Sequence, residues 1–207
     1  MRAFLRGQRV ALLALPVLLV LAVLASGQRV VELWWPYEML ERVALDGRGT
    51  AHFSTTTETQ SAGMVPVELS VRHVETRPAD AVELLGGEQV PVPPGLDAWR
   101  VRVHVEAAPT TVLTTCQVLL RDTRGREYAS GTTALAGGVA DLASCQPGGD
   151  VVNPTVFDMD ADRESTRPPQ YDRDAVFLLP EGAVPEVVRV SPDLHLYADW
   201  PLASDGG

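Results

Sequence analysis

A strict alternation of apolar and polar residues within the stretch 97–130 limits, more than any other feature, what this chain can fold into. Val101, Val103 and Val105 alternate with arginine, histidine and glutamate. This period of two points one side of a β-strand into a core and the other side at water. The pattern therefore predicts a half-buried strand that opens on Trp99.

Two further strands are predicted directly after this one. β-Branched and apolar residues fill almost every position of 111–120, as is typical of a central strand. Residues 122–125 supply turn chemistry, because Gly125 tolerates a positive φ, and a third run follows at 126–130. We therefore expect a β-meander of three consecutive antiparallel strands.

A second clear alternation lies upstream of the meander. Val65, Val67, Leu69 and Val71 alternate with polar residues and Pro66, which predicts another half-buried strand. Pro66 favours an edge position at its start, because proline cannot donate to a ladder. The threonine-rich run 50–60 favours an edge strand as well.

Composition supports an all-β domain and excludes several kinds of function. The 16 prolines and 17 glycines are spread along the chain, as frequent turns between short strands require. The chain contains no lysine, which excludes Schiff-base chemistry and the P-loop lysine. Four of the 17 arginines precede the first acidic residue, so residues 30–207 carry 13 arginines against 27 acidic residues, a net charge of −14. Such a surface repels phosphate, and we expect no nucleic-acid binding.

The N-terminal segment is predicted to meet a membrane. After a basic flank, residues 10–25 are 16 consecutive uncharged residues, mostly leucine, valine and alanine. A helix of that length covers about 24 Å, less than the roughly 30 Å of hydrocarbon, so a cleaved secretory signal and a true span both stay open. The apolar character continues to Trp34 and Trp35, which would form an aromatic belt, and Arg9 marks the opposite interface. We expect a transmembrane or signal-anchor helix with the rest of the chain outside the cytoplasm.

These patterns give an expected domain organisation around one core. A turn-rich, charged stretch at 150–173 with a Pro168-Pro169 pair is read as a long exposed loop. The predicted divisions are a basic cytoplasmic flank (1–9), a membrane anchor (10–35), a juxtamembrane connector (36–60), an antiparallel β-sandwich (61–202) and a disordered tail (203–207).

Cys116 and Cys145 are the only cysteines, and both fall on the side predicted to lie outside the cytoplasm. An even count in an oxidising compartment favours a disulfide. Closing a loop of that length stabilises a fold by about 3–4 kcal/mol in the chain-entropy model. We therefore predict a structural bridge between the two residues.

Several of these features together carry a resemblance. They are the N-terminal anchor, a strand opening on Trp99, a cysteine in the next strand, and the late runs Phe-Leu-Leu-Pro-Glu-Gly at 177–182 and Val-Val-Arg-Val at 187–190. Over residues 60–200 the chain resembles the membrane-anchored, immunoglobulin-like extracytoplasmic domains of actinobacteria, mostly of unknown function. The resemblance implies an immunoglobulin-like β-sandwich and no catalytic residues. In antibody domains the tryptophan lies between two cysteines, whereas Trp99 precedes both, so kinship to them is architectural.

A second resemblance supports an enzymatic alternative. Leu-Thr-Thr-Cys at 113–116 resembles the Thr-Leu-x-Thr-Cys strand of sortases, with Val112 in place of the first threonine. A sortase-like transpeptidase would use Cys116 as nucleophile with a histidine upstream and an arginine downstream. About 80 residues follow that arginine here, which a sortase lacks, and a second cysteine could oxidise the nucleophile. The candidate partners are His52, His73, Arg124 and Arg126.

No cofactor or metal is expected. Acidic residues alternate like the start of a calcium loop at Asp158, Asp160, Asp162 and Glu164. Arg163 and Pro169, however, occupy positions where an EF-hand needs glycine and glutamate. We read this stretch as a solvated acidic loop. His73, His104 and His195 lack metal-ligand spacing and are expected to be surface histidines on strands.

The sequence favours a non-enzymatic, membrane-anchored cell-envelope protein that presents an acidic β-sandwich to a protein or cell-wall partner. This hypothesis rests on the predicted topology and on the missing catalytic motifs. The alternatives are the sortase-like enzyme and an accessory subunit of a membrane complex that uses residues 10–35 as its contact helix.

The predicted topology is testable with reporter fusions. Because the positive charge precedes residue 10, a periplasm- or exterior-dependent reporter fused after Gly207 should be active, and a cytoplasm-dependent reporter should be silent. Activity of the cytoplasmic reporter would refute the topology. N-terminal sequencing that starts at Ser26 would instead establish a cleaved signal.

Overall fold

The computed structural model describes residues 41–59, 63–83, 89–130, 145–147, 165–193 and 195–202. These residues belong to one compact unit. The predicted anchor with Arg9, Trp34 and Trp35, the predicted calcium-like residues and the tail 203–207 lie outside the described residues. Within the described part, no helix is long and apolar enough to cross a bilayer.

The described residues form strands throughout. The strands are β1 (Glu41–Arg42), β2 (Thr50–Thr59), β3 (Gly63–Ala79), β4 (Ala81–Glu83), β5 (Gln89–Pro91), β6 (Leu96–Ala107), β7 (Gln117–Asp122), β8 (Glu127–Ala129), β9 (Gln170–Pro180), β10 (Pro185–Ser191) and β11 (Leu196–Pro201).

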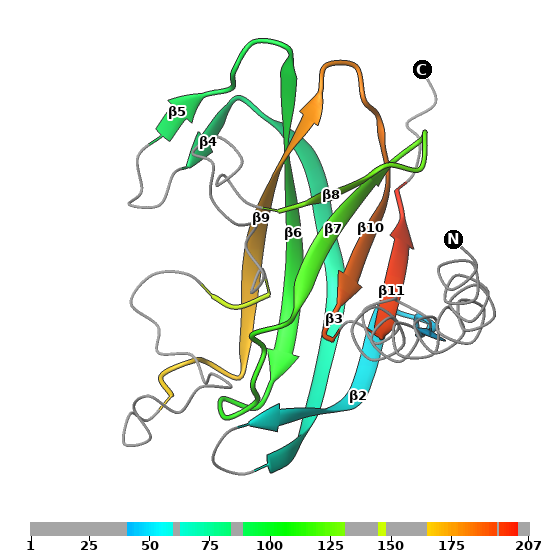
Figure 1. Cartoon of the computed structure of the whole chain (residues 1–207), viewed down its shortest axis with the longest axis vertical. Helices are drawn as coiled ribbons and strands as arrows, with labels where there is room; N and C mark the ends of the chain where they lie inside the picture. The colour runs from blue at the N-terminus through cyan, green and yellow to red at the C-terminus, as the bar shows by residue number, and fades with distance from the viewer. Residues whose placement is uncertain are drawn as a thin grey trace, which may run out of the picture. The chain divides into compact units, whose positions relative to one another are not determined.

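Two sheets build the domain (Figure 1). One is four-stranded with the order β2-β3-β6-β9, and the other is five-stranded with the order β1-β11-β10-β7-β8. Neighbouring strands are antiparallel except β1 and β11, which run parallel. The short β4-β5 hairpin extends from the connection between β3 and β6.

The core lies between these two sheets. Val101, Val103 and Val105 of the four-stranded sheet are fully buried, and Val188 and Val190 of the five-stranded sheet are buried in the same cluster. Two sheets that bury their facing side chains in one cluster make a β-sandwich. The predicted all-β sandwich is therefore confirmed.

The two clearest alternations in the sequence correspond to two neighbouring strands. β6 buries every second residue from Val101 to Ala107, including all three of its valines, and exposes or half-exposes the residues between them. β3 buries Val67, Leu69 and Val71 on the same side. β6 pairs with β3 only from Leu69 onward, so Pro66 has β2 alone as its neighbour. The edge position predicted for this proline is thus confirmed for its end of the strand.

The predicted meander is wrong, because β6 and β7 belong to different sheets. Residues 108–116 are a crossover: the Thr111 amide donates to the Ala108 carbonyl at 2.9 Å and the Cys116 amide donates to the Leu113 carbonyl at 3.1 Å. Leu113 is fully buried within this crossover. The apolar character that predicted a central strand from 111 comes from a turn packed into the sandwich, and the strand begins only at Gln117.

The domain boundaries also differ from the prediction at two places. β1 and β2 are members of the two sheets, so the sandwich includes residues that were assigned to the connector 36–60. β9 starts at Gln170, so the expected exposed loop 150–173 already contains strand at its end. Arg167, within that expected loop, is only 2% exposed. Its guanidinium donates to the Ala108 carbonyl, a tertiary contact that local composition does not encode.

The β7–β8 hairpin is organised by one buried carboxylate. Asp122 Oδ1 accepts hydrogen bonds from the amides of Arg124 and Arg126 at 2.9 Å each, and Oδ2 accepts from the Tyr128 hydroxyl at 3.0 Å and from Arg126 Nε at 2.8 Å. Gly125 adopts a φ of 77°, as the turn residues predicted. Burial raises the pKa of Asp122, but the hydrogen bonds from Arg126, Tyr128 and Arg124 outweigh it and lower the pKa to about 2.

Replacing Asp122 with asparagine should therefore destabilise the fold in a pH-dependent way. The folded pKa lies below the ordinary value of 3.8, so the carboxylate stabilises the fold fully above that value, and this stabilisation is lost as the pH falls toward about 2. Urea unfolding should show Asp122→Asn less stable than wild type at pH 6, with the gap closing below pH ~4. Asp80→Asn, at an exposed position, is the control and should change little at either pH. A gap that is the same at both pH values would contradict this account.

Candidate interaction surface

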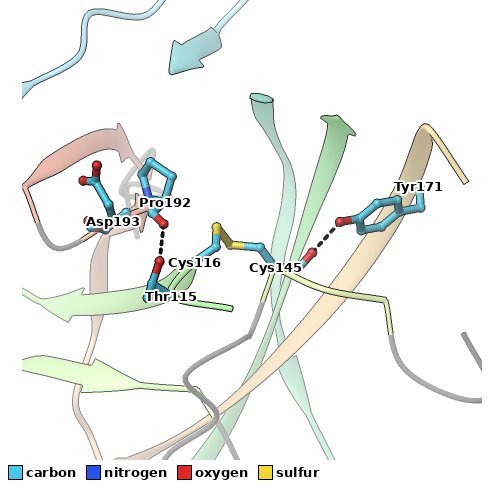
Figure 2. Close-up of a disulfide and its surroundings, with 7 residues drawn as sticks. Thr115, Cys116, Cys145, Tyr171, Pro192 and Asp193 are labelled. Carbon is cyan, nitrogen blue, oxygen red and sulfur yellow. Dashed lines mark hydrogen bonds between the residues drawn. A yellow bond between two sulfur atoms is a disulfide. The ribbon is translucent and has the colours of Figure 1, made fainter. Parts of the chain in front are cut away.

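Cys116 and Cys145 are joined by a disulfide, as predicted from the sequence, with their Cα atoms 5.5 Å apart. Both residues are fully buried. Figure 2 shows the bridge between the crossover that precedes β7 and the short segment at residue 145. The bond closes one end of the sandwich.

Polar contacts extend this closure toward both sheets (Figure 2). The Tyr171 hydroxyl of β9 donates to the Cys145 carbonyl at 2.9 Å, and the Thr115 hydroxyl donates to the Pro192 carbonyl at 2.9 Å. The next residue, Asp193, accepts a hydrogen bond from the Thr55 hydroxyl of β2. Burial raises the pKa of Tyr171, which keeps its hydroxyl protonated as a donor. The disulfide thus lies at the centre of a chain of contacts from β9 to β2.

The same geometry gives no support to the sortase-like alternative. A nucleophile needs a free, accessible thiolate, whereas the sulfur of Cys116 is bonded and buried. The nominated partners have other contacts: His52 Nδ1 is 2.8 Å from the Ser70 hydroxyl, His73 Nε2 is 2.8 Å from the Thr76 hydroxyl, and Arg126 pairs with Asp122. Arg124, the fourth candidate, is exposed in the β7–β8 turn. No described contact brings any of them to Cys116.

Charged side chains gather on the outer side of β3, β6 and β9, a surface called here the charged face. They point away from the core because each alternates with a buried residue or lies in register with one that does. Three arginines, one histidine and four carboxylates make up the charged face: Glu75, Arg77, Arg100, Arg102, His104, Glu106, Asp172 and Asp174.

Arg102 is the centre of the charged face. Its Nε and Nη2 donate to the two carboxylate oxygens of Asp174, directly opposite in the β6–β9 register, at 2.7 and 3.0 Å. Its Nη1 lies 3.7 Å from Glu75 of β3. The hydrogen bond from Arg102 lowers the pKa of Asp174, and Asp174 in turn raises the pKa of Arg102. One guanidinium therefore ties three strands together in a bidentate arrangement.

His104 extends the charged face toward its exposed end. Its Nδ1 lies 2.7 Å from Asp172 and its Nε2 lies 3.4 Å from Glu106. The side chain of Asp172 is 54% exposed and that of Glu106 is 50% exposed. Both carboxylates thus lie beside His104 while about half of each side chain stays exposed. Such preorganised charges suit recognition of a cationic partner.

The outer side of the five-stranded sheet carries a more closed arrangement. Arg189 donates to both oxygens of Asp199 at 2.7 and 3.0 Å and to Glu127 at 2.6 Å, and its guanidinium lies 4.3 Å from the centre of the Tyr197 ring. The side chain of Arg189 is only 14% exposed, and that of Asp199 only 10%. This cluster links neighbouring strands of its own sheet, and it presents fewer exposed charged groups to a partner than the charged face does.

The remaining sequence-predicted sites have simple outcomes. Among the described residues, no group of histidine, cysteine and acidic side chains could hold a metal. Asp158, Asp160 and Asp162 lie outside the described residues. His195 is exposed, whereas His73 and His104 are half-buried on β3 and β6.

Sequence reasoning missed the pairing of Arg102 with Asp174, 72 residues apart. Alternation identified both strands, but it does not say which strands are neighbours or in what register. Arg167 was missed as well: it is buried, its Nη2 donates to the Ala108 carbonyl, and burial lowers its pKa. Its position in a charged, proline-containing stretch carried no signal for burial.

Comparison with known proteins identifies no family for this chain. No protein-family model matches the chain, and no curated protein matches it. Among solved structures, the chain is similar to an uncharacterized β-sandwich protein from Clostridium difficile 630, with 10% sequence identity and a TM-score of 0.36. The similarity covers 80% of this chain and 95% of that one.

The disulfide should dominate the stability of this end of the sandwich. Alkylation of the native, unreduced protein should label neither cysteine, and alkylation after unfolding and reduction should label both. The double variant Cys116→Ala/Cys145→Ala should lower the free energy of unfolding by about 3–4 kcal/mol, because a 29-residue separation gives a large loop-closure term. Rapid labelling of Cys116 in the folded, unreduced protein would overturn the bridge and revive the sortase-like reading.

Proposed function

We propose that this chain is a non-enzymatic interaction module of the cell envelope, anchored in the membrane by residues 10–35 and binding a protein partner through the charged face of its β-sandwich. The observation that carries the proposal is the set of fixed, half-open carboxylates at Asp172 and Glu106. Asp172 lies within hydrogen-bond distance of His104, at 2.7 Å, and Glu106 lies 3.4 Å from the other ring nitrogen, within a face stiffened by Arg102, so a cationic partner would meet charges already in place.

The proposed location outside the cytoplasm is supported by the disulfide. Cys116 and Cys145 are the only cysteines of the chain, and both are used in a buried bridge. Structural disulfides persist in oxidising compartments and are rare in the cytosol. The uninterrupted apolar run 10–25 and the basic flank before it favour an anchor with the sandwich outside.

The strand order favours assigning this β-sandwich to the immunoglobulin-like class, of the kind found in actinobacterial envelope proteins. β6 pairs with β9 in one sheet, and each is followed by a crossover to the other sheet, where β7, β10 and β11 are neighbours. This order is similar to the Greek-key arrangement in which immunoglobulin-like domains pair strand B with E and strand F with C and G, and it supports the assignment. Such domains commonly serve recognition rather than catalysis.

Recovery of a partner from solubilised membranes tests the proposal. Full-length wild-type protein should retain a partner in stoichiometric amount, and Asp172→Lys should lose most of it, because the substitution reverses an exposed charge of the charged face. Glu181→Lys makes the same charge change at an exposed position in the turn after β9 and should retain the partner.

Three results would contradict the proposal in different ways. If the wild-type protein recovers no partner in stoichiometric amount, the proposed interaction function is refuted. A partner that both variants retain equally would favour an accessory subunit that binds through residues 10–35. Retention of cell-wall glycan in place of protein would reassign the partner class.

A further inference from the structure

β9 forms one border of the four-stranded sheet, with β6 as its only hydrogen-bonded neighbour among the described strands. The Ala107 amide donates to the Pro169 carbonyl at 2.9 Å, and these two residues continue the register that pairs Glu106 with Gln170. In an antiparallel ladder, alternate residues direct both backbone groups to the same neighbour. Odd-numbered residues of β9 therefore face β6, and even-numbered residues face away.

This parity leaves a row of outward backbone groups along β9. The N–H and C=O groups concerned belong to every second residue of the strand, and no described residue pairs with them on that side. They span most of the strand: Gln170, Asp172, Asp174, Val176 and Leu178. An unpaired row of this length is a template for another extended chain.

Among the described residues, the edge lacks two of the features that block such pairing, a bulge and an internal proline. β9 and β6 pair through eleven consecutive residues with no bulge, whereas the β3–β6 register shifts between His73 and Glu75. Pro168 and Pro169 precede β9, and within the strand the one proline is Pro180, at its last position. A long, regular edge without internal proline or bulge is the type that accepts an added strand.

Side chains beside the edge define what would fit. The even-numbered residues lie on the outer side, because Ala175, Phe177 and Leu179 point into the core. Moving along β9, the outer side is first acidic, at Asp172 and Asp174, and then apolar, at the half-exposed pair Val176 and Leu178. Side chains on neighbouring strands contact each other directly, so one half of an added strand would lie beside the acidic pair and the other half beside the apolar pair.

We propose that β9 binds an extended segment of the partner protein as an added antiparallel strand, with apolar residues opposite Leu178 and Val176 and basic residues opposite Asp174 and Asp172. This inference rests on the proposed interaction function and names how the partner is bound. Backbone hydrogen bonds along the edge supply affinity, and the apolar-then-basic order supplies specificity. The net charge of −10 adds a general attraction for basic segments.

A second copy of this chain is a poorer occupant of the edge. The antiparallel register that pairs all four outer residues of two copies sets Asp172 opposite Leu178 and Asp174 opposite Val176. Each carboxylate would then lose water beside an apolar side chain without gaining a new charged partner across the interface. A heterologous basic segment avoids this cost.

The edge can be probed directly with a peptide. The probe has isoleucine, valine, arginine and arginine in that order, alternating with threonine, and carries a fluorophore. Anisotropy titration should show saturable binding to the full-length chain in mild detergent. The same peptide with glutamate for both arginines should bind at least about tenfold more weakly, because one desolvated charge pair contributes that much affinity or more.

A proline substitution separates edge pairing from attraction to the charged face. Val176→Pro removes an N–H that faces away from β6, so the hydrogen bonds between β6 and β9 stay intact. An added strand, however, loses this N–H as a donor to one of its carbonyls and clashes with the proline ring. Binding should weaken about tenfold. The matched control is Thr56→Pro on β2, whose outward parity follows from the bond between the Asp46 amide and the Thr50 carbonyl at 2.9 Å. It should bind like wild type.

An N-methylated peptide tests the proposal on the wild-type protein, independently of whether the proline variant folds. Methylating the amides that face β9 should abolish binding, because the charges stay while the backbone donors are lost. The proposal is overturned if wild type shows no saturable binding, if the methylated peptide binds as well as the parent, or if a folded Val176→Pro binds as well as wild type. Dimerisation of the free chain that Val176→Pro abolishes would assign the edge to a second copy.

Failure of the edge proposal can be distinguished from failure of the proposed interaction function. A stoichiometric membrane partner that Val176→Pro retains, together with failed peptide binding, would remove the edge proposal and leave the interaction function standing. Absence of any partner for wild type would remove the function itself, whatever the peptide does.

Discussion

β6 and β9 pair residue for residue from Leu96 opposite Pro180 to Glu106 opposite Gln170, and the rest of the domain depends on this ladder. Its side-chain parity sends three valines of β6 into the core and sets Arg102 directly opposite Asp174 on the outside. Its backbone parity leaves the even-numbered amides of β9 facing outward. The core, the charged face and the outward direction of the even-numbered backbone groups of β9 are thus three consequences of one register.

The disulfide and its contacts lie beside this ladder, because β6 leads into the crossover that holds Cys116 and Tyr171 of β9 bonds to Cys145. β6 and β9 are each followed by a crossover to the other sheet, and a crossover without anchors would let the two sheets slide. The Cys116–Cys145 bridge fixes the first crossover, and the Tyr171 hydroxyl bonded to the Cys145 carbonyl joins β9 to the same point. One covalent bond therefore supports the sheet that carries the charged face and the sheet that packs behind it.

The sequence allowed prediction of what alternation and residue chemistry encode locally. Val101, Val103 and Val105 identified a half-buried strand, Gly125 marked a turn, and the two cysteines indicated a bridge. Alternation carries no information about neighbours, so the meander was placed wrongly and the pairing of Arg102 with Asp174 went unseen. Compact crossovers also resemble strands in composition, because both are buried.

The candidate site likewise combines features that the sequence encodes locally with features that depend on which strands become neighbours. The bridge came from cysteine count and compartment, which are properties of residues taken singly. The charged face and the open edge come from strand order, which arises only when distant segments meet. Asp172 and Asp174 lay in or beside a stretch that composition assigned to a loop, so nothing local identified them as a recognition surface.

Residue-resolved amide hydrogen exchange of the free, full-length chain tests the central claim most directly, because exchange reports whether each amide is hydrogen-bonded. The β6–β9 register predicts slow exchange for the odd-numbered amides of β9, at Tyr171, Arg173, Ala175 and Phe177, and fast exchange for the even-numbered ones, at Asp172, Asp174, Val176 and Leu178. Equal protection of the two sets would mean that the edge is already paired, and would contradict both the open edge and the docking mode built on it.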